Sequence, residues 1–219
     1  MGGVESITQR EPAVVPDFQR LLESNRAWVA EKLAQDPEFF RKLAEGQRPP
    51  FLFFGCSDSR KSLNSMTGTG PGELFIHRNI ANQVPLGDLN VQAVLEFAIL
   101  NLGVRHVVVG GHTRCGGVGA ALAGLEEGAL GAWLRELRTL ADSHAEELAP
   151  LPSLLDRANR LSEINVVAQV RNVLLSPAYR KAKEEGTAPT VHGWMIDLAS
   201  GYIREMDLPE EKWRTEGLL

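Results

Sequence analysis

Two short runs of aromatic and β-branched residues constrain the fold of this chain more than any other feature. They are FLFFG at residues 51–55 and RHVVVGG at 105–111, and polar side chains follow each run directly. Such runs are typical of strands that are buried on both faces, as in parallel sheets covered by helices. The valines of the second run also favour a strand over a short buried helix. We therefore predict two central strands of an α/β sheet.

The segments around these runs predict further strands and helices. ELFIHRN at 73–79 predicts another strand, and Asp88 is placed to cap a helix over 89–102. Helices are also predicted over 117–125, 130–149 and 153–175, and TVHGWMIDL and GYIREMDL predict a hairpin that turns at 199–201. Strands that alternate with helices predict a mostly parallel central sheet flanked by helices, with an antiparallel edge.

The N-terminal part of the chain has a helical pattern. Apolar residues recur at helical spacing between residues 17 and 46, and Asp36 and Pro37 interrupt them, which predicts two amphipathic helices. A chain of 219 residues is long enough for one large domain. We predict a flexible tail over 1–15 and a single domain over 16–219, in which residues 16–46 form an N-terminal helical arm.

Charge and hydropathy exclude several classes of partner. The formal net charge is -5, and lysines and arginines are scattered, so no basic stripe exists for nucleic acid. No apolar run approaches the roughly 18 residues that a membrane-spanning helix needs, so we expect no stable membrane association. The N-terminus lacks a basic segment followed by an apolar one, which favours a cytoplasmic protein over a secreted one.

The two cysteines stand in polar, glycine-flanked stretches rather than among apolar neighbours. Cys56 lies in GCSDSR at 55–60, and Cys115 lies in GGHTRCGG at 110–117 together with His112. Both stretches follow predicted strands, and in open parallel sheets ligands bind beyond the carboxyl ends of the strands. If the two strands are neighbours, these three side chains meet at one point.

Two thiolates and one imidazole suit zinc, and three protein ligands with an open fourth position are typical of a catalytic zinc site. Asp58 can then accept a hydrogen bond from a metal-bound solvent molecule while Arg60 clamps its carboxylate. If Arg60 moved away, Asp58 could bind the metal itself and expel the water. The backbone N–H groups of Gly116 and Gly117 favour a small anion beside the metal.

Each motif also has a simpler interpretation. C-x-D-x-R alone fits a capping Asp with a surface ion pair, and H-x-x-C alone fits a hydrogen-bonded core histidine. A structural zinc site would need a fourth ligand nearby, and a redox pair would need C-x-x-C. His77, at a predicted strand end, is either a proton carrier near the site or a hydrogen-bonded structural residue. GTGPG at 68–72 predicts a turn, because it lacks the Lys and Ser/Thr of a phosphate loop.

Together, four stretches closely resemble the β-class carbonic anhydrases, in order and in approximate spacing. They are CSDSR at 56–60, PGELFIHRNIAN at 71–82, GHTRCGGV at 111–118 and HGW at 192–194. The resemblance covers about residues 15–207, and the motif GHTRCGG is most similar to that of the short, fungal-type members.

The resemblance implies that Cys56, His112 and Cys115 bind Zn²⁺, and that the Asp58–Arg60 dyad orients a zinc-bound hydroxide that attacks CO2. The reaction would be the reversible hydration of carbon dioxide to bicarbonate and a proton. The remaining implied substrate contacts are Gln47, Phe75 and Phe97. The resemblance further implies a homodimer or larger assembly, in which Gln47 and Phe75 serve the zinc of the partner and the helical arm reaches across to it. The alternatives are a carbonyl sulfide or carbon disulfide hydrolase on the same fold, and a non-enzymatic bicarbonate sensor that keeps the zinc.

Overall fold

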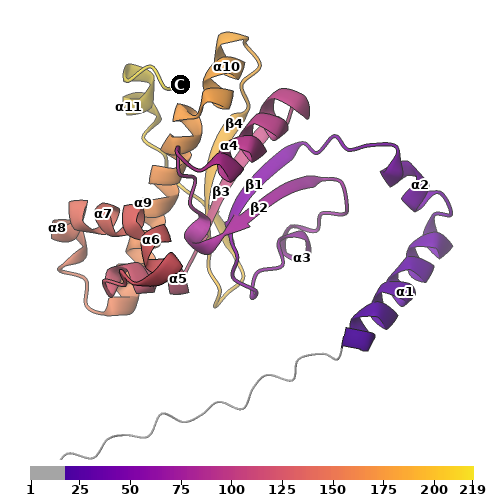
Figure 1. Cartoon of the computed structure of the whole chain (residues 1–219), viewed down its shortest axis with the longest axis horizontal. Coiled ribbons are helices and arrows are strands. Elements are labelled where there is room, and N and C mark those ends of the chain that lie inside the picture. Colours follow the sequence, from indigo (N-terminus) through magenta and orange to yellow (C-terminus); the bar gives the residue numbers. More distant parts are fainter. Residues whose placement is uncertain (1–17) are drawn as a thin grey trace, which may run out of the picture. The chain divides into compact units, whose positions relative to one another are not determined.

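The structure is a computed structural model that describes residues 18–219 (Figure 1). The predicted tail over 1–15 lies outside the described residues. The described residues divide into two compact units, 18–46 and 47–219. In the described part of the chain, no helix is both long enough and apolar enough to cross a membrane.

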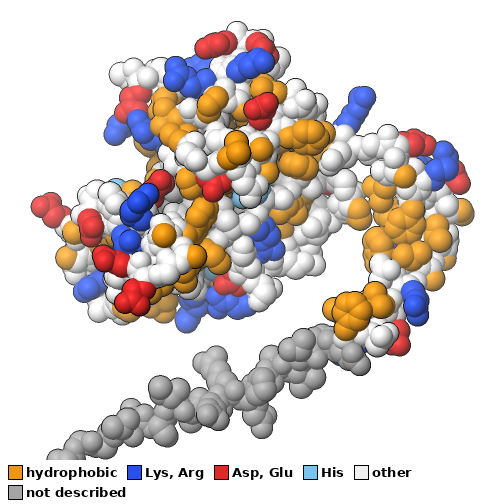
Figure 2. Space-filling view, viewed as in Figure 1, with side chains coloured by type: hydrophobic (Ala, Val, Ile, Leu, Met, Phe, Trp, Pro, Cys, Tyr) orange, Lys and Arg blue, Asp and Glu red, His pale blue; other side chains and the backbone are white. Residues whose placement is uncertain are grey.

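The first unit contains the two predicted helices, α1 (Phe18–Gln35) and α2 (Phe39–Ala44). They are separated where expected, because Asp36 accepts a hydrogen bond from the backbone of Glu38 at 3.0 Å and an ion pair from Lys42 at 2.7 Å. No residue of either helix is buried within the unit, and Figure 2 shows hydrophobic side chains gathered on these helices. The exposed apolar residues of α1 are Phe18, Leu21, Leu22, Trp28 and Leu33.

The second unit is built on a five-stranded sheet in the order β2-β1-β3-β4-β5. The first four strands of the sheet run parallel, and β5 pairs antiparallel with β4 at the edge, as predicted. β1 and β3 are neighbours, and Gly55 is paired with Gly110 in their register. The strands are β1 (Phe51–Cys56), β2 (Leu74–Asn79), β3 (His106–His112), β4 (Thr190–Ile196) and β5 (Ile203–Glu205).

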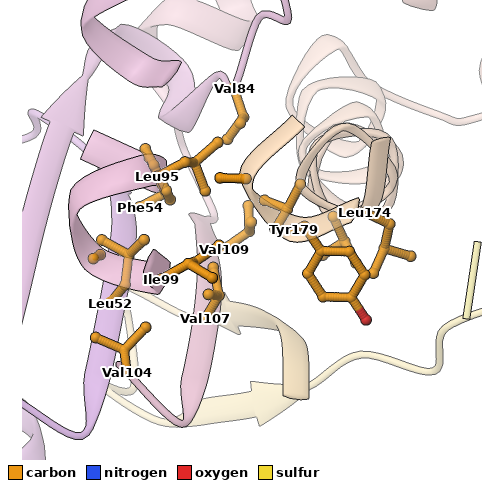
Figure 3. Close-up of a cluster of buried hydrophobic side chains, with 14 of the residues drawn as sticks. Leu52, Phe54, Val84, Leu95, Ile99, Val104, Val107, Val109, Leu174 and Tyr179 are labelled. Carbon is orange, nitrogen blue, oxygen red and sulfur yellow. The ribbon is translucent and has the colours of Figure 1, made fainter. Parts of the chain in front are cut away.

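Helices cover the sheet unequally. On one face, α4 (Leu89–Glu96), α9 (Leu154–Leu175) and α10 (Pro177–Glu184) enclose the main core around Leu52, Phe54 and Val109 (Figure 3). On the other face, Phe53 and Val108 pack with residues of the short helix α3 (Leu63–Thr67). The remaining elements are η1 (Ile80–Asn82), η2 (Phe97–Asn101), α5 (Gly116–Leu122), α6 (Gly128–Trp133), α7 (Arg135–Ser143), α8 (Ala145–Leu148) and α11 (Glu210–Thr215).

The single helix that we predicted over 130–149 is wrong, because this segment forms the three short helices α6, α7 and α8. The guanidinium of Arg138 donates to the carbonyl of Gly131 at 2.7 Å and so satisfies a backbone group at the end of α6. The helix predicted over 89–102 does begin at the Asp88 cap, where the carboxylate accepts from the Val91 N–H at 2.9 Å. Its last turn is the π-helical η2 rather than α-helix. Helices α3, α10 and α11 were not predicted.

Candidate metal centre

Cys56, His112 and Cys115 converge at the carboxyl ends of β1 and β3. Cys56 is the last residue of β1, His112 is the last residue of β3, and Cys115 follows in the turn before α5. All three are buried, and their Sγ and ring nitrogen atoms lie within 4.8 Å of one another. The predicted meeting point is therefore present, because β1 and β3 are paired neighbours.

The spacing of the two thiols fits a tetrahedral zinc ion. The Sγ atoms of Cys56 and Cys115 are 3.9 Å apart. Two zinc–sulfur bonds of about 2.3 Å at a tetrahedral angle place their sulfur atoms about 3.8 Å apart. Neither cysteine forms a disulfide.

His112 presents one nitrogen to this point with no other partner. Its Nδ1 lies 2.8 Å from the carbonyl oxygen of Thr113, so Nδ1 carries the proton and donates it there. That leaves the Nε2 lone pair facing the thiols, and Nε2 is buried without a hydrogen-bond partner among the described residues. A buried acceptor without a donor is costly, and a metal ion bound to the lone pair would remove that cost. The donor set therefore fits Zn²⁺.

The two thiols do not lose protons equally. Their shared hydrogen bond lowers the pKa of the Cys56 thiol, and the same bond, together with burial, raises the pKa of Cys115. Without a metal, the pair therefore favours one thiolate and one thiol. A bound divalent cation would stabilise both as thiolates, because it compensates the second negative charge.

Asp58 and Arg60 form a bidentate ion pair beside the ligands. Arg60 Nε donates to Asp58 Oδ1 at 2.9 Å, and Arg60 Nη2 donates to Oδ2 at 2.6 Å. These bonds hold the pKa of Asp58 well below its usual range, so the carboxylate stays ionised. Asp58 Oδ2 lies 3.9 Å from His112 Nε2, close enough to reach a group bound beside that nitrogen.

Arg60 also joins the two loops that carry the ligands. Its Nη2 donates to the carbonyl of Arg114 at 3.1 Å. Arg114 has the left-handed backbone angle φ 57°, and its N–H donates to the Asn159 side chain at 2.9 Å. This strained turn places Cys115 next to His112, so Asn159 on α9 helps to position the second thiol.

Arg78 supports the loop after β1, a role that was not predicted from the sequence. Its guanidinium donates to the carbonyls of Cys56 at 2.8 Å, Asp58 at 2.8 Å and Lys61 at 3.2 Å. The signal was present in the sequence, because Arg78 stands near the carboxyl end of a predicted strand, as the predicted site does. Lys61 itself is buried, and that burial lowers the pKa of its ammonium group.

Gly116 and Gly117 begin α5 directly after Cys115, as the sequence predicted. A Cβ atom on Gly117 would lie 2.6 Å from Ile80 Cγ2, so only glycine fits between α5 and η1 without movement. Gly116 has nothing within 4 Å of such an atom, and it borders open space. The anion predicted beside this turn stays a prediction.

The residues predicted for the substrate wall lie away from the ligands of their own chain. Phe75 is paired with Leu52, four residues before Cys56, which is about 13 Å along the strand. Phe97 packs against Phe75 with ring centroids 5.8 Å apart, and Gln47 is exposed before β1 begins. A single chain therefore does not bring these three residues to its own metal centre.

A separate cavity of about 510 Å³ lies near the ends of β1 and β2, and its lining includes Ser57, His77 and Trp133. His77 faces this cavity, and burial lowers the pKa of its imidazole. Asn79 Nδ2 approaches His77 Nε2 at 3.5 Å. None of the three metal-ligand candidates lines the cavity, so the role of His77 as a proton carrier stays a prediction.

Comparisons with known proteins point to one family. The family model described as carbonic anhydrase matches residues 51–203. A carbonic anhydrase of Emericella nidulans is 45% identical over 189 residues, which cover 86% of this chain and 83% of that protein. Among solved structures, one of two tetrameric β-carbonic anhydrases of Sordaria macrospora has a TM-score of 0.82 at 42% identity, covering 86% of this chain and 96% of that one. The β-carbonic anhydrase CafA of Aspergillus fumigatus has a TM-score of 0.84 at 40% identity, covering 90% and 95%.

Proposed function

Because this chain belongs to the β class of the carbonic anhydrase family, we propose that it hydrates CO2 reversibly at a zinc ion held by Cys56, His112 and Cys115. One observation carries the proposal: the buried Nε2 of His112 faces two thiols at zinc-ligand spacing and has no other partner in the described chain. Three ligands leave a fourth tetrahedral position open, as in catalytic zinc sites.

Zinc bound there would supply a nucleophile from water near neutral pH, because it lowers the pKa of a coordinated water molecule to about 7. Asp58 would accept a hydrogen bond from that nucleophile and so orient it towards the CO2 carbon. Arg60 holds both oxygens of Asp58, so the carboxylate is kept off the metal and remains an acceptor. The alternative state, in which Asp58 binds zinc, requires that both of these hydrogen bonds break.

The start of α5 favours the product. Bicarbonate carries one negative charge, and Gly116 follows Cys115 directly and borders open space. Exposed N–H groups at a helix start favour an anion and developing oxyanion charge. These groups therefore lower the energy of the charge that forms as CO2 becomes bicarbonate.

We further propose that the site is completed by a second copy of the chain. Gln47 and Phe75 lie far from the metal ligands of their own chain, and α1 presents apolar side chains that are not buried within its unit. A homo-oligomer would bring Phe75, Phe97 and Gln47 of one protomer to the zinc of another, where an apolar wall suits uncharged CO2. The Sordaria macrospora relative is described as tetrameric.

Stopped-flow CO2 hydration with metal analysis tests the reaction. We expect turnover that depends on one zinc ion per chain and is lost when a chelator removes it. Parallel assays with carbonyl sulfide and carbon disulfide separate the hydrolase alternative. Zinc-loaded protein without CO2 hydration would reject the proposed function and favour a bicarbonate sensor.

A further inference from the structure

A second cluster of imidazole and carboxylate groups lies at the opposite end of β3 from His112. His106 begins β3, and His192 on β4 is paired with Val108, so the two histidines are diagonal neighbours on one face of the sheet. Their facing atoms, His106 Nδ1 and His192 Nε2, are 3.1 Å apart. Among the described residues, the helix that packs on this face is the five-residue α3.

Glu205 on β5 decides which ring nitrogen of His192 carries the proton. Its Oε1 lies 2.7 Å from His192 Nδ1, and an ionised carboxylate only accepts, so Nδ1 carries the proton. A neutral His192 then presents the Nε2 lone pair to His106. This is the arrangement in which a carboxylate orients a metal-binding histidine through its far nitrogen.

Two ring nitrogens this close require a positive centre between them. That centre is either a proton, donated by His106 Nδ1, or a metal ion that replaces it. Two bonds of 2.0–2.1 Å to a tetrahedral ion place the nitrogens about 3.3 Å apart. The observed 3.1 Å therefore needs a shift of only about 0.2 Å.

The surroundings keep His106 in place and available. The ring of Phe51 stacks on it, with centroids 5.1 Å apart and an interplanar angle of 24°. Burial, together with the positive charge of Arg105, lowers the pKa of His106, so the ring is neutral at physiological pH. The side chain of His192 is 25% exposed and that of Glu205 is 64% exposed, so ions in solution can reach the pair.

We propose that His106 Nδ1 and His192 Nε2 form a second binding site, for a divalent transition-metal ion that prefers imidazole. Glu205 orients His192, and water fills the remaining positions. Among divalent first-row transition metals, copper(II) binds such a site most tightly, ahead of zinc and nickel. His106 and His112 are six residue steps apart along β3, which is about 20 Å, so the two metal sites are distinct.

The test uses full-length protein already loaded with zinc. Copper(II) is added below one equivalent for electron paramagnetic resonance, and up to saturation for equilibrium dialysis. We expect one additional ion per chain, with hyperfine coupling from two imidazole nitrogens. His106→Gln and His192→Gln should each abolish binding of that ion. Glu205→Gln should lower its affinity about 10–100-fold, as expected for a carboxylate that orients a ligand.

His144→Gln is the matched control, because His144 is another histidine, and its Nδ1 lies 3.0 Å from the Leu140 carbonyl of the preceding helix α7. It should leave the additional ion in place, and circular dichroism checks that every variant is folded. Wild-type spectra without two-nitrogen coupling overturn the proposal whether or not the variants fold. Retention of the ion by both histidine variants also overturns it.

Discussion

Arg60 holds both carboxylate oxygens of Asp58 through two separate nitrogens, and it bonds the Arg114 carbonyl with the same Nη2 that holds Oδ2. One side chain thus sets the position of the acceptor and joins the two ligand-bearing loops. Neither Asp58 nor Arg60 is one of the three proposed metal ligands. Either residue can therefore be substituted without removing a ligand.

Asp58→Ala and Arg60→Ala should each keep zinc and lose most CO2 hydration. The reason is that both residues direct the nucleophile and neither supplies a ligand in the proposed state. Losses of about 10–100-fold are typical when a group that orients a metal site is mutated. Stopped-flow hydration with zinc analysis on the same samples checks this, and unchanged turnover would contradict the role of the dyad.

Cys56→Ser and His112→Ala should abolish both zinc binding and activity, because each removes one of only three ligands. Zinc content per chain, measured on purified protein, is the readout. Asp58→Ala serves as the matched control, since it alters the same loop and leaves the ligands intact. Full zinc occupancy in either ligand variant would reject the assignment of the metal centre.

Zinc affinity should fall as the pH falls. The raised pKa of Cys115 means that its thiol is protonated in the metal-free protein at neutral pH, and binding must release that proton. One proton released per ion makes the logarithm of the affinity rise by about one per pH unit. Competition against a chelator at several pH values measures this slope, and a flat profile near neutrality would show that no proton leaves.

Gly117→Ala should lower the free energy of unfolding by about 1–3 kcal/mol, as overpacking does. The new Cβ would meet Ile80 Cγ2 at 2.6 Å and Ala81 Cβ at 3.3 Å. Gly116→Ala is the matched control, because its Cβ meets nothing within 4 Å. Urea unfolding of both variants tests the difference, and equal midpoints would mean that η1 moves freely away from α5.

Arg78→Met should destabilise the protein by about 2 kcal/mol or more, because hydrogen bonds from a charged group contribute about 1.5–3 kcal/mol each. It should also weaken zinc binding, since the carbonyl of Cys56 loses its donor. Arg171→Met is the control, because Arg171 makes an ion pair with Glu216 at 3.3 Å on an exposed part of the fold. Zinc affinity that falls equally in both variants would mean that Arg78 has no special role.

The sheet and the ligand set were predictable from the sequence for a physical reason. Buried parallel strands have apolar runs that differ from the surrounding residues, and their carboxyl ends lie at one edge. Once FLFFG and RHVVVGG are neighbouring strands, Cys56 and His112 must lie close together. The cap at Asp88 is equally local, because it depends on a side chain three residues from its partner.

Features that depend on distant side chains were not predictable in this way. The periodicity over 130–149 is helical throughout, but Arg138 reaches back to the Gly131 carbonyl near the end of α6. Arg78 contacts residues 17 to 22 positions earlier in the chain, and only the paired strands bring them together. The His106–His192 contact likewise spans 86 positions and depends on the register of β3 with β4.

Cys56 and His112 end two different strands, so the alignment of those strands decides whether both reach one ion. A slip of a single residue turns every side chain of a strand to the opposite face of the sheet. A chain that folded with β3 out of step would point His112 away from both thiols and capture no zinc. Metal uptake would thus discriminate correctly folded molecules from misaligned ones, and zinc content should report the folding quality of a preparation.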